Sequence, residues 1–203
     1  GEVVDRLNAP EVFGKIAHGA WKTGEPGVFF VDQANRYNPV PHLGGYEATN
    51  PCGEQPLPPN GACLLGSFNL VKYVSRHGIH SGEPASFDYV QLQDDIRHVV
   101  RAMDNVVDRA VYPLAAQQLE AQSKRRMGLG VTGVANAIEG LGHDYGSPGF
   151  LHVFKTIMQI IRDSAYRASI DLAIEKGPFP LFDPLMLDSA FARSLPEDIR
   201  DSI

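Results

Sequence analysis

Asn50-Pro51-Cys52-Gly53-Glu54 is the stretch on which the interpretation of this sequence depends. It sets an amide, a thiol and a carboxylate at every second position. In extended backbone, alternate side chains point the same way, so Asn50, Cys52 and Glu54 would share one face. Helix is disfavoured, because Pro51 pushes the residue before it towards extended geometry and Gly53 would break a helix two residues later. We therefore expect a loop that presents these three groups to one side, into a common cavity.

The same stretch resembles the active-site loop of a known enzyme family. Residues 50–57 (Asn-Pro-Cys-Gly-Glu-Gln-Pro-Leu) and 61–70 (Gly-Ala-Cys-Leu-Leu-Gly-Ser-Phe-Asn-Leu) are similar to the active-site loop and following strand of the ribonucleotide reductase large subunit. The Pro-Cys-Gly-Glu-Gln form is most similar to the adenosylcobalamin-dependent class. Residues 124–133 and 175–182 also resemble that family, and the likeness runs from about residue 24 to about residue 183.

Bulk properties limit the function classes. The chain has 203 residues and a net charge of −6, which suits one domain and argues against a phosphate-tracking nucleic-acid surface. No apolar run is long enough to span a bilayer, and no signal peptide is visible. Two cysteines do not make a secreted disulfide scaffold, so we expect a cytoplasmic protein. Because the family's catalytic chains are longer, we interpret residues 1–203 as a single partial barrel domain that lacks its N- and C-terminal parts.

The pattern of apolar residues and breakers predicts an alternation of strands and helices. We expect helices from Pro10 to about Gly24, over 87–111 with Ser86 as cap, over 132–139 and over 149–176; we expect strands over 27–31, 62–74 and 127–131, and a long loop over 32–60. Such alternation indicates an α/β fold with parallel pairing and leaves open a doubly wound sheet or a barrel. The resemblance implies the ten-stranded α/β barrel of ribonucleotide reductases, with Cys52 on a central finger loop.

The resemblance also implies catalytic roles for the loop. Cys52 would carry a transient thiyl radical that abstracts the 3′ hydrogen of the ribose, and Glu54 would be the general base for the 3′-hydroxyl. Asn50 would hold that hydroxyl as the 2′-hydroxyl leaves as water. Pro51 and Gly53 would complete the substrate-binding loop. From the residues alone, a turn asparagine, a small buried thiol and a solvated acid are the alternatives.

Cys63 is the second cysteine of the chain. Its apolar neighbours fit core packing, whereas the resemblance makes it half of a redox pair that becomes a disulfide with a cysteine on an earlier strand. No cysteine precedes Cys52 here. We therefore expect that Cys52 and Cys63 are not bonded to each other and that the isolated 203-residue chain is inactive.

Three further patterns have ordinary explanations. Residues 128–133 match G-x-G-x-x-G, but a basic run rather than an apolar strand precedes them, so we expect close strand–helix packing rather than a dinucleotide site. His77 and His80, with His42 as a third ligand, would suit a metal, but their context indicates a turn and we predict no metal site. Residues 124–126 (Lys-Arg-Arg) are predicted to be a solvated basic run, with a diphosphate contact as the alternative.

The implied activity is the reduction of ribonucleotides to 2′-deoxyribonucleotides, the precursors for DNA synthesis and repair. The resemblance implies adenosylcobalamin as cofactor, a ribonucleoside diphosphate or triphosphate as substrate, a thioredoxin- or glutaredoxin-type reductant, and a homodimer, with no nucleic-acid or membrane partner. One alternative is the large chain of a two-subunit reductase, whose radical comes from a small subunit. Another is a non-catalytic piece that acts only as a binding or assembly module.

Overall fold

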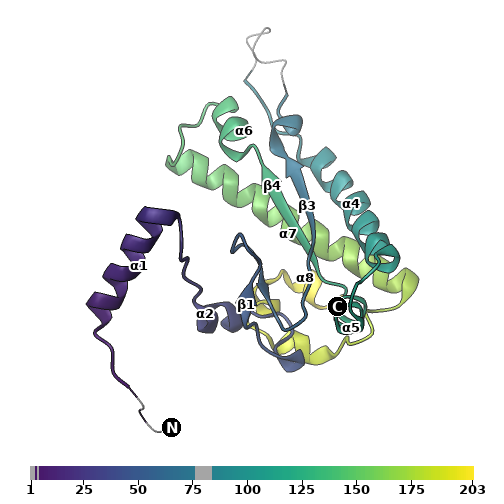
Figure 1. Cartoon of the computed structure of the whole chain (residues 1–203). Coiled ribbons are helices and arrows are strands. Elements are labelled where there is room, and N and C mark those ends of the chain that lie inside the picture. Colours follow the sequence, from purple (N-terminus) through teal and green to yellow (C-terminus); the bar gives the residue numbers. More distant parts are fainter. Residues whose placement is uncertain (1–2, 4, 76–83) are drawn as a thin grey trace.

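The computed structural model describes residue 3 and residues 5–75 and 84–203. Figure 1 shows a parallel pair of strands with long helices beside it, a small hairpin near the C-terminal segment, and an N-terminal helix that projects away from the rest. The elements are α1 (Ala9–Thr23), α2 (Val31–Arg36), η1 (Pro41–Leu43), β1 (Ala48–Thr49), β2 (Pro56–Leu57), β3 (Leu64–Asn69), η2 (Leu70–Tyr73), α4 (Tyr89–Arg109), α5 (Ala115–Lys124), β4 (Met127–Thr132), α6 (Val134–Gly140), α7 (Pro148–Lys176), η3 (Pro184–Asp188), η4 (Ala192–Ser194) and α8 (Glu197–Arg200).

The core forms where α4 and α7 cover the β3–β4 pair. β3 and β4 are parallel, in a register that runs from Leu64 opposite Met127 to Asn69 opposite Thr132. The expected parallel pairing is therefore confirmed. The apolar side of α7 faces this core, as its sequence pattern predicts, and burying it removes apolar surface from water. Large side chains that are fully buried at the centre include Leu70, Leu92, Ile96, Ile138 and Ile157.

The described residues do not close a barrel. They form two separate two-stranded sheets, the antiparallel pair β1–β2 and the parallel pair β3–β4. Among the same residues, no helix is long and apolar enough to cross a membrane.

Two predictions near the strands are wrong. Residues 27–31 do not form a buried strand, because no described strand lies beside them to complete the backbone hydrogen bonds. Val28 and Phe30 are 58% and 71% exposed instead, and Val31 begins α2. The strand expected over 62–74 is shorter, since the Asn69 side chain accepts a hydrogen bond from Val71 N at 3.2 Å and starts a turn of 3₁₀ helix.

Helix ends follow local capping chemistry, with one correction. Ser147 caps α7 by accepting from Phe150 N at 3.1 Å, and α7 ends at Gly177 as predicted. Ser86 does not cap α4. Its hydroxyl bonds to Ser75, while the Asp88 side chain accepts from Gln91 N at 2.9 Å and starts the helix.

The long segment over 32–60 is ordered by asparagine side chains. Asn35 forms two hydrogen bonds with the backbone of Tyr46, accepting from its N–H at 2.7 Å and donating to its carbonyl at 3.0 Å. Asn38, which is only 2% exposed, donates to Gly44 O and accepts from Val40 N, each at 3.0 Å. Because side-chain amides here replace the missing sheet partners, the chain reaches the β1–β2 hairpin in a fixed path.

The G-x-G-x-x-G stretch serves packing, as predicted. Gly133 has a φ of +68° and is the N-cap residue that precedes α6, and a Cβ on it would lie 2.9 Å from Val71 and 3.0 Å from Asn69. Gly128 lies in β4, where a Cβ would lie 2.7 Å from Gln55 Nε2 and 2.9 Å from Cys63 Sγ. A Cβ at either position would force a neighbouring side chain to shift, and the positive φ of Gly133 adds backbone strain for any other residue.

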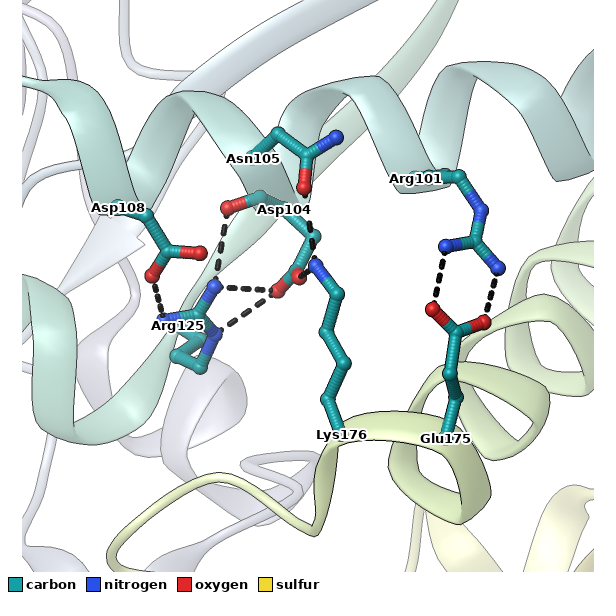
Figure 2. A network of polar contacts seen from close by, with 7 residues as sticks. All are labelled: Arg101, Asp104, Asn105, Asp108, Arg125, Glu175 and Lys176. Carbon is teal, nitrogen blue, oxygen red and sulfur yellow. Dashed lines mark hydrogen bonds and ion pairs between the residues drawn. The ribbon is translucent and has the colours of Figure 1, made fainter.

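The prediction of a solvated basic run over 124–126 is wrong. Arg125 bonds to Asp104 on α4 through Nε at 2.8 Å and to Asp108 through Nη1 at 2.6 Å, as Figure 2 shows. Lys176, at the end of α7, bonds to Asp104 Oδ2 at 2.8 Å. The Asp104 side chain is only 9% exposed, so it needs these two cations to offset its lost hydration.

The network also predicts the acid sensitivity of the fold. The hydrogen bond from Arg125 lowers the pKa of Asp108 from its ordinary value. A carboxylate whose pKa is lower in the folded than in the unfolded chain contributes stability above its unfolded pKa. That contribution is lost as the pH falls through the folded value, so protonation loosens the junction between α4 and β4.

We predict that Asp104→Asn destabilises the fold by about 1–3 kcal/mol, because it leaves Lys176 without its ion-pair partner and leaves Arg125 with Asp108 alone. Urea unfolding followed by circular dichroism measures the change. Asp94→Asn is the matched control on the same helix. Its carboxylate is 54% exposed and lies 3.9 Å from Arg97, so it should cost less than about 1 kcal/mol. Equal effects from the two variants would contradict the assignment.

We predict that Gly128→Ala destabilises the fold by about 1–3 kcal/mol, because the new methyl group overlaps Gln55 and Cys63. Gly130→Ala on the same strand is the control, since its Cβ would meet its nearest atom, Ser67 Oγ, at 3.3 Å. Thermal unfolding of both variants is the measurement. A Gly128→Ala protein as stable as the Gly130→Ala protein would show that the crowding above Gly128 is absent.

Candidate active site

The loop that carries Cys52 is the turn of the β1–β2 hairpin. Asn50 N donates to Gln55 O at 3.2 Å, and Gly53 N donates to Asn50 O at 3.0 Å, which closes a four-residue turn over 50–53. Pro51 takes the second position of this turn, where its fixed φ suits, and Gly53 has a φ of +83°. The extended, period-two backbone that we expected is therefore wrong, because the chain reverses direction within these residues.

The Asn50 side chain ties the two sides of the turn together. Its Oδ1 accepts a hydrogen bond from Gln55 N at 3.0 Å, and its Nδ2 donates to Glu54 Oε1. The amide and the carboxylate therefore meet by this bond rather than by strand alternation. An oriented carboxylate next to a polar amide can accept a proton from a bound hydroxyl.

Cys52 lies at the tip of the turn with an exposed side chain and a free thiol. Glu54 is exposed as well. The thiol is therefore accessible to a reactant that approaches the hairpin, and it is not packed as a small buried hydrophobe.

Cys63 directly precedes β3 and is half-buried. Its thiol donates to Leu64 O at 3.6 Å. Burial raises the pKa of the Cys63 thiol, while the positive charge of Arg126 and a hydrogen bond from Gln55 lower it and the charge of Glu54 raises it. Both cysteines are free, so the expectation that they are not bonded to each other is confirmed.

The structure brings the hairpin loop to the start of the β3–β4 pair. Gln55, the residue after the loop, lies beside Cys63 above Gly128. Arg126 precedes β4 and forms an ion pair with Glu120 at 3.5 Å. The sequence interpretation missed both Gln55 and Arg126. The signal for them is positional, since one adjoins Glu54 and the other stands two residues before Gly128, on the same face of the extended chain.

Two tyrosines border this region. Burial raises the pKa of Tyr46, and the charge of Arg126 partly lowers it. Tyr166 on α7 has a pKa of about 12, raised first by burial and then by Tyr46. Tyrosine is already neutral at physiological pH and these shifts move its ionisation further away, so no phenolate cancels the positive charge of Arg126.

The cavities of about 560 and 410 Å³ lie away from the loop. The larger is lined by the end of α7 and residues 177–182, and the smaller by α5 and residues 59–60. Neither is lined by residues 50–54 or by Cys63. A cavity shared by Asn50, Cys52 and Glu54 thus stays a prediction.

The histidine interpretation involves only one described residue. His42 has two buried ring nitrogens without a hydrogen-bond partner, while His77 and His80 lie outside the described residues. Within residue 3 and residues 5–75 and 84–203, no group of three or more His, Cys, Asp or Glu side chains is placed to hold a metal ion.

The chain is similar to curated proteins over most of its length. It is 39% identical over 97% of its residues to a vitamin B12-dependent ribonucleoside-diphosphate reductase of Mycobacterium tuberculosis (strain CDC 1551 / Oshkosh), covering 27% of that protein. It is 38% identical over 88% of its residues to a protein of the same name from Thermoplasma acidophilum, covering 22% of it. A vitamin B12-dependent ribonucleotide reductase of Streptomyces clavuligerus is 29% identical over 88% of the chain and 18% covered.

The chain thus spans about a quarter or less of the length of these relatives. The model of the barrel domain of ribonucleotide reductase matches residues 2–195, nearly the whole sequence. A match of that extent, together with the two relatives above 35% identity, settles the family. The chain belongs to the ribonucleotide reductases and is part of their barrel domain.

Proposed function

We propose that this chain supplies the radical loop and one redox thiol of a ribonucleoside-diphosphate reductase. Such an enzyme replaces the 2′-hydroxyl of a ribonucleotide by hydrogen. The observation that carries the proposal is the pairing of Asn50 with Glu54 on the turn that exposes the Cys52 thiol. That arrangement combines a hydrogen-atom carrier, a base and an amide within five residues.

Cys52 is the residue we assign to hydrogen-atom transfer. As a thiyl radical it takes the 3′ hydrogen atom of the ribose, which leaves a thiol on Cys52 and an unpaired electron on the sugar carbon. The same hydrogen returns to the sugar at the end of the cycle and restores the thiyl radical. Exposure of Cys52 at the tip of the turn supports this role, because the sugar must reach the sulfur directly.

Glu54 and Asn50 are assigned to the proton movements. Glu54 accepts the 3′-hydroxyl proton, and the bond from Asn50 leaves its second carboxylate oxygen available for that proton. The Asn50 amide has a second N–H that can bond to a ribose oxygen as the 2′-hydroxyl departs as water. Pro51 and Gly53 shape the turn against which the sugar would lie.

Cys63 is assigned to the supply of electrons. Replacing the 2′-hydroxyl by hydrogen, with release of water, consumes two electrons and two protons, which a pair of thiols provides when it becomes a disulfide. Cys63 would be one of that pair, and the other is a thiol beyond the two cysteines of this chain. An external dithiol of the thioredoxin or glutaredoxin type would then reduce the disulfide by exchange.

The names of the relatives support adenosylcobalamin as the radical source. The feature of this chain that suits such a cofactor is the Cys52 thiol, which is exposed and accessible to a reactant. The described residues offer no cluster of ligands for cobalt, so we assign none of them to the cofactor. When bound, the cofactor would supply the oxidising equivalent that removes the hydrogen atom from Cys52. A cytoplasmic homodimer that uses a ribonucleoside diphosphate or triphosphate completes the proposal.

We predict that Cys52→Ser abolishes nucleotide reduction in the complete reductase and leaves substrate affinity nearly unchanged. A hydroxyl has a similar shape, but its bond to hydrogen is much stronger, so an oxygen radical would not form reversibly. Deoxynucleotide formation and substrate binding are measured on the same preparation, with and without adenosylcobalamin. Turnover by the variant would refute the thiyl assignment. Activity of the unchanged enzyme without the cofactor, given a separate radical-generating subunit, would favour the two-subunit class.

We predict that Glu54→Gln lowers turnover by about 10²–10⁴-fold, because the amide keeps the shape of the side chain and cannot accept the proton. Glu47→Gln is the matched control. Glu47 is also exposed and precedes β1, and only its backbone N–H bonds across the hairpin, to Leu57 O at 3.1 Å. Turnover of the control should stay at the level of the unchanged enzyme. An equally small effect in both variants would make Glu54 a structural residue of the turn.

A further inference from the structure

Gln55 is the residue at which the hairpin loop meets Cys63. Its main chain belongs to the hairpin, since its N–H donates to Asn50 Oδ1 at 3.0 Å and its carbonyl accepts from Asn50 N at 3.2 Å. Its side-chain Nε2 and the Cys63 sulfur lie 2.7 and 2.9 Å from the one point where a Cβ of Gly128 would stand. Two atoms that close to one point lie no more than about 5.6 Å apart, so the amide and the thiol are neighbours over β4.

The groups that face Cys63 come from two segments of the chain. Gln55 and Glu54 come from the hairpin, and Arg126 directly precedes β4. Arg126 is shared with Glu120 on α5, at 3.5 Å, and also faces Tyr46. The thiol therefore has one amide donor, one cation and one carboxylate around it, and the amide is the only one of these tied to the Asn50 turn by two backbone hydrogen bonds.

We propose that Gln55 is a positioning residue for Cys63. Its side-chain amide donates a hydrogen bond to the sulfur, holds it over Gly128 and stabilises the thiolate form, while its main chain stays tied to Asn50. Gln55 thereby fixes the position of the Cys63 thiol relative to the loop that carries Cys52.

This assignment has a chemical consequence that rests on the proposed function. When an external dithiol reduces a disulfide that contains Cys63, one of its sulfurs attacks the partner sulfur and forms a new S–S bond there. The old S–S bond breaks and Cys63 leaves as a thiolate with the electron pair. A leaving thiolate of lower pKa departs faster. Donors from Gln55 and charge from Arg126 would therefore speed regeneration.

The test measures the acidity of Cys63 without any turnover. With Cys52→Ser, Cys63 is the only thiol of the chain, so the rate of alkylation by iodoacetamide against pH reports its apparent pKa. Gln55→Met keeps the length of the side chain and removes the amide. Gln55→Glu keeps the shape and replaces the N–H donor by a carboxylate. Gln93→Met, at an exposed position of α4, is the matched control.

We expect Gln55→Met to shift the profile to higher pH and to slow alkylation at neutral pH by about three-fold or more, since a lost hydrogen bond to a charged group removes much of the thiolate fraction. Gln55→Glu should shift it further, because a second negative charge faces the sulfur. Arg126→Gln should raise the apparent pKa, and Arg126→Lys should restore it. The control should match the Cys52→Ser parent.

A profile of Gln55→Met that coincides with that of Gln93→Met, with unchanged near-ultraviolet circular dichroism, would overturn the inference. If Gln55→Met loses the near-ultraviolet circular dichroism signal, the isosteric Gln55→Glu variant is used in its place. An unshifted alkylation profile of Gln55→Glu would likewise overturn the inference. The outcome is separable from the proposed function. The alkylation profile needs no turnover, whereas the proposed function is judged by the activity of the complete reductase with Cys52 intact. A shifted profile beside an inactive complete reductase refutes only the proposed function, and an unshifted profile beside an active complete reductase refutes only the role of Gln55.

Discussion

The buried carboxylate of Asp104 is the constraint on which the arrangement of this chain depends. It lies on α4 and takes one cation from the residues before β4 and another from the end of α7. A charge withdrawn from water is tolerated only where its partners are complete, so the three elements must converge at this point. Because these elements meet at Asp104, the position of the start of β4 is fixed, and so are the positions of Arg126 and Gly128. The surroundings of Cys63 depend on the same junction.

Amide side chains solve a second problem, the ordering of a segment with little regular structure. Along the chain from α2 to β3, Asn35, Asn38 and Asn50 each bond to backbone groups that would otherwise lack partners. The last of them also binds Glu54, so one residue both closes the hairpin and orients an acid. Gln55 continues the series and joins the hairpin to β4. A loop held in this way keeps the geometry of its reactive groups without a surrounding sheet.

Local chemistry made part of this fold predictable. Ser147-Pro148 and Gly177 mark the ends of α7 because capping depends on neighbouring residues alone, and the apolar spacing of α4 and α7 correctly indicated the core. Features that depend on distant partners were not predictable. The basic run before β4 looked solvated, because Asp104 lies 21 residues away in sequence. The strand expected around Phe29 lacks a partner strand among the described residues. The importance of Gln55 depends on its contact with Gly128, which is distant in the sequence. For the site, the sequence indicated the loop and its residue types, but the turn at Gly53 required the hydrogen bonds of Asn50.

The spacing of the Asp104 partners along the chain has a consequence for synthesis. Arg125 follows Asp104 by 21 residues, but Lys176 follows by 72. At the usual pace of translation, Lys176 is added on the order of 4 to 14 s after Asp104. During that interval the carboxylate has at most one of its two cations, so α4 and the nascent β4 can associate only loosely. The β3–β4 pair, with the Cys63 thiol beside it, should therefore reach its final packing late, when the last turn of α7 has left the ribosome.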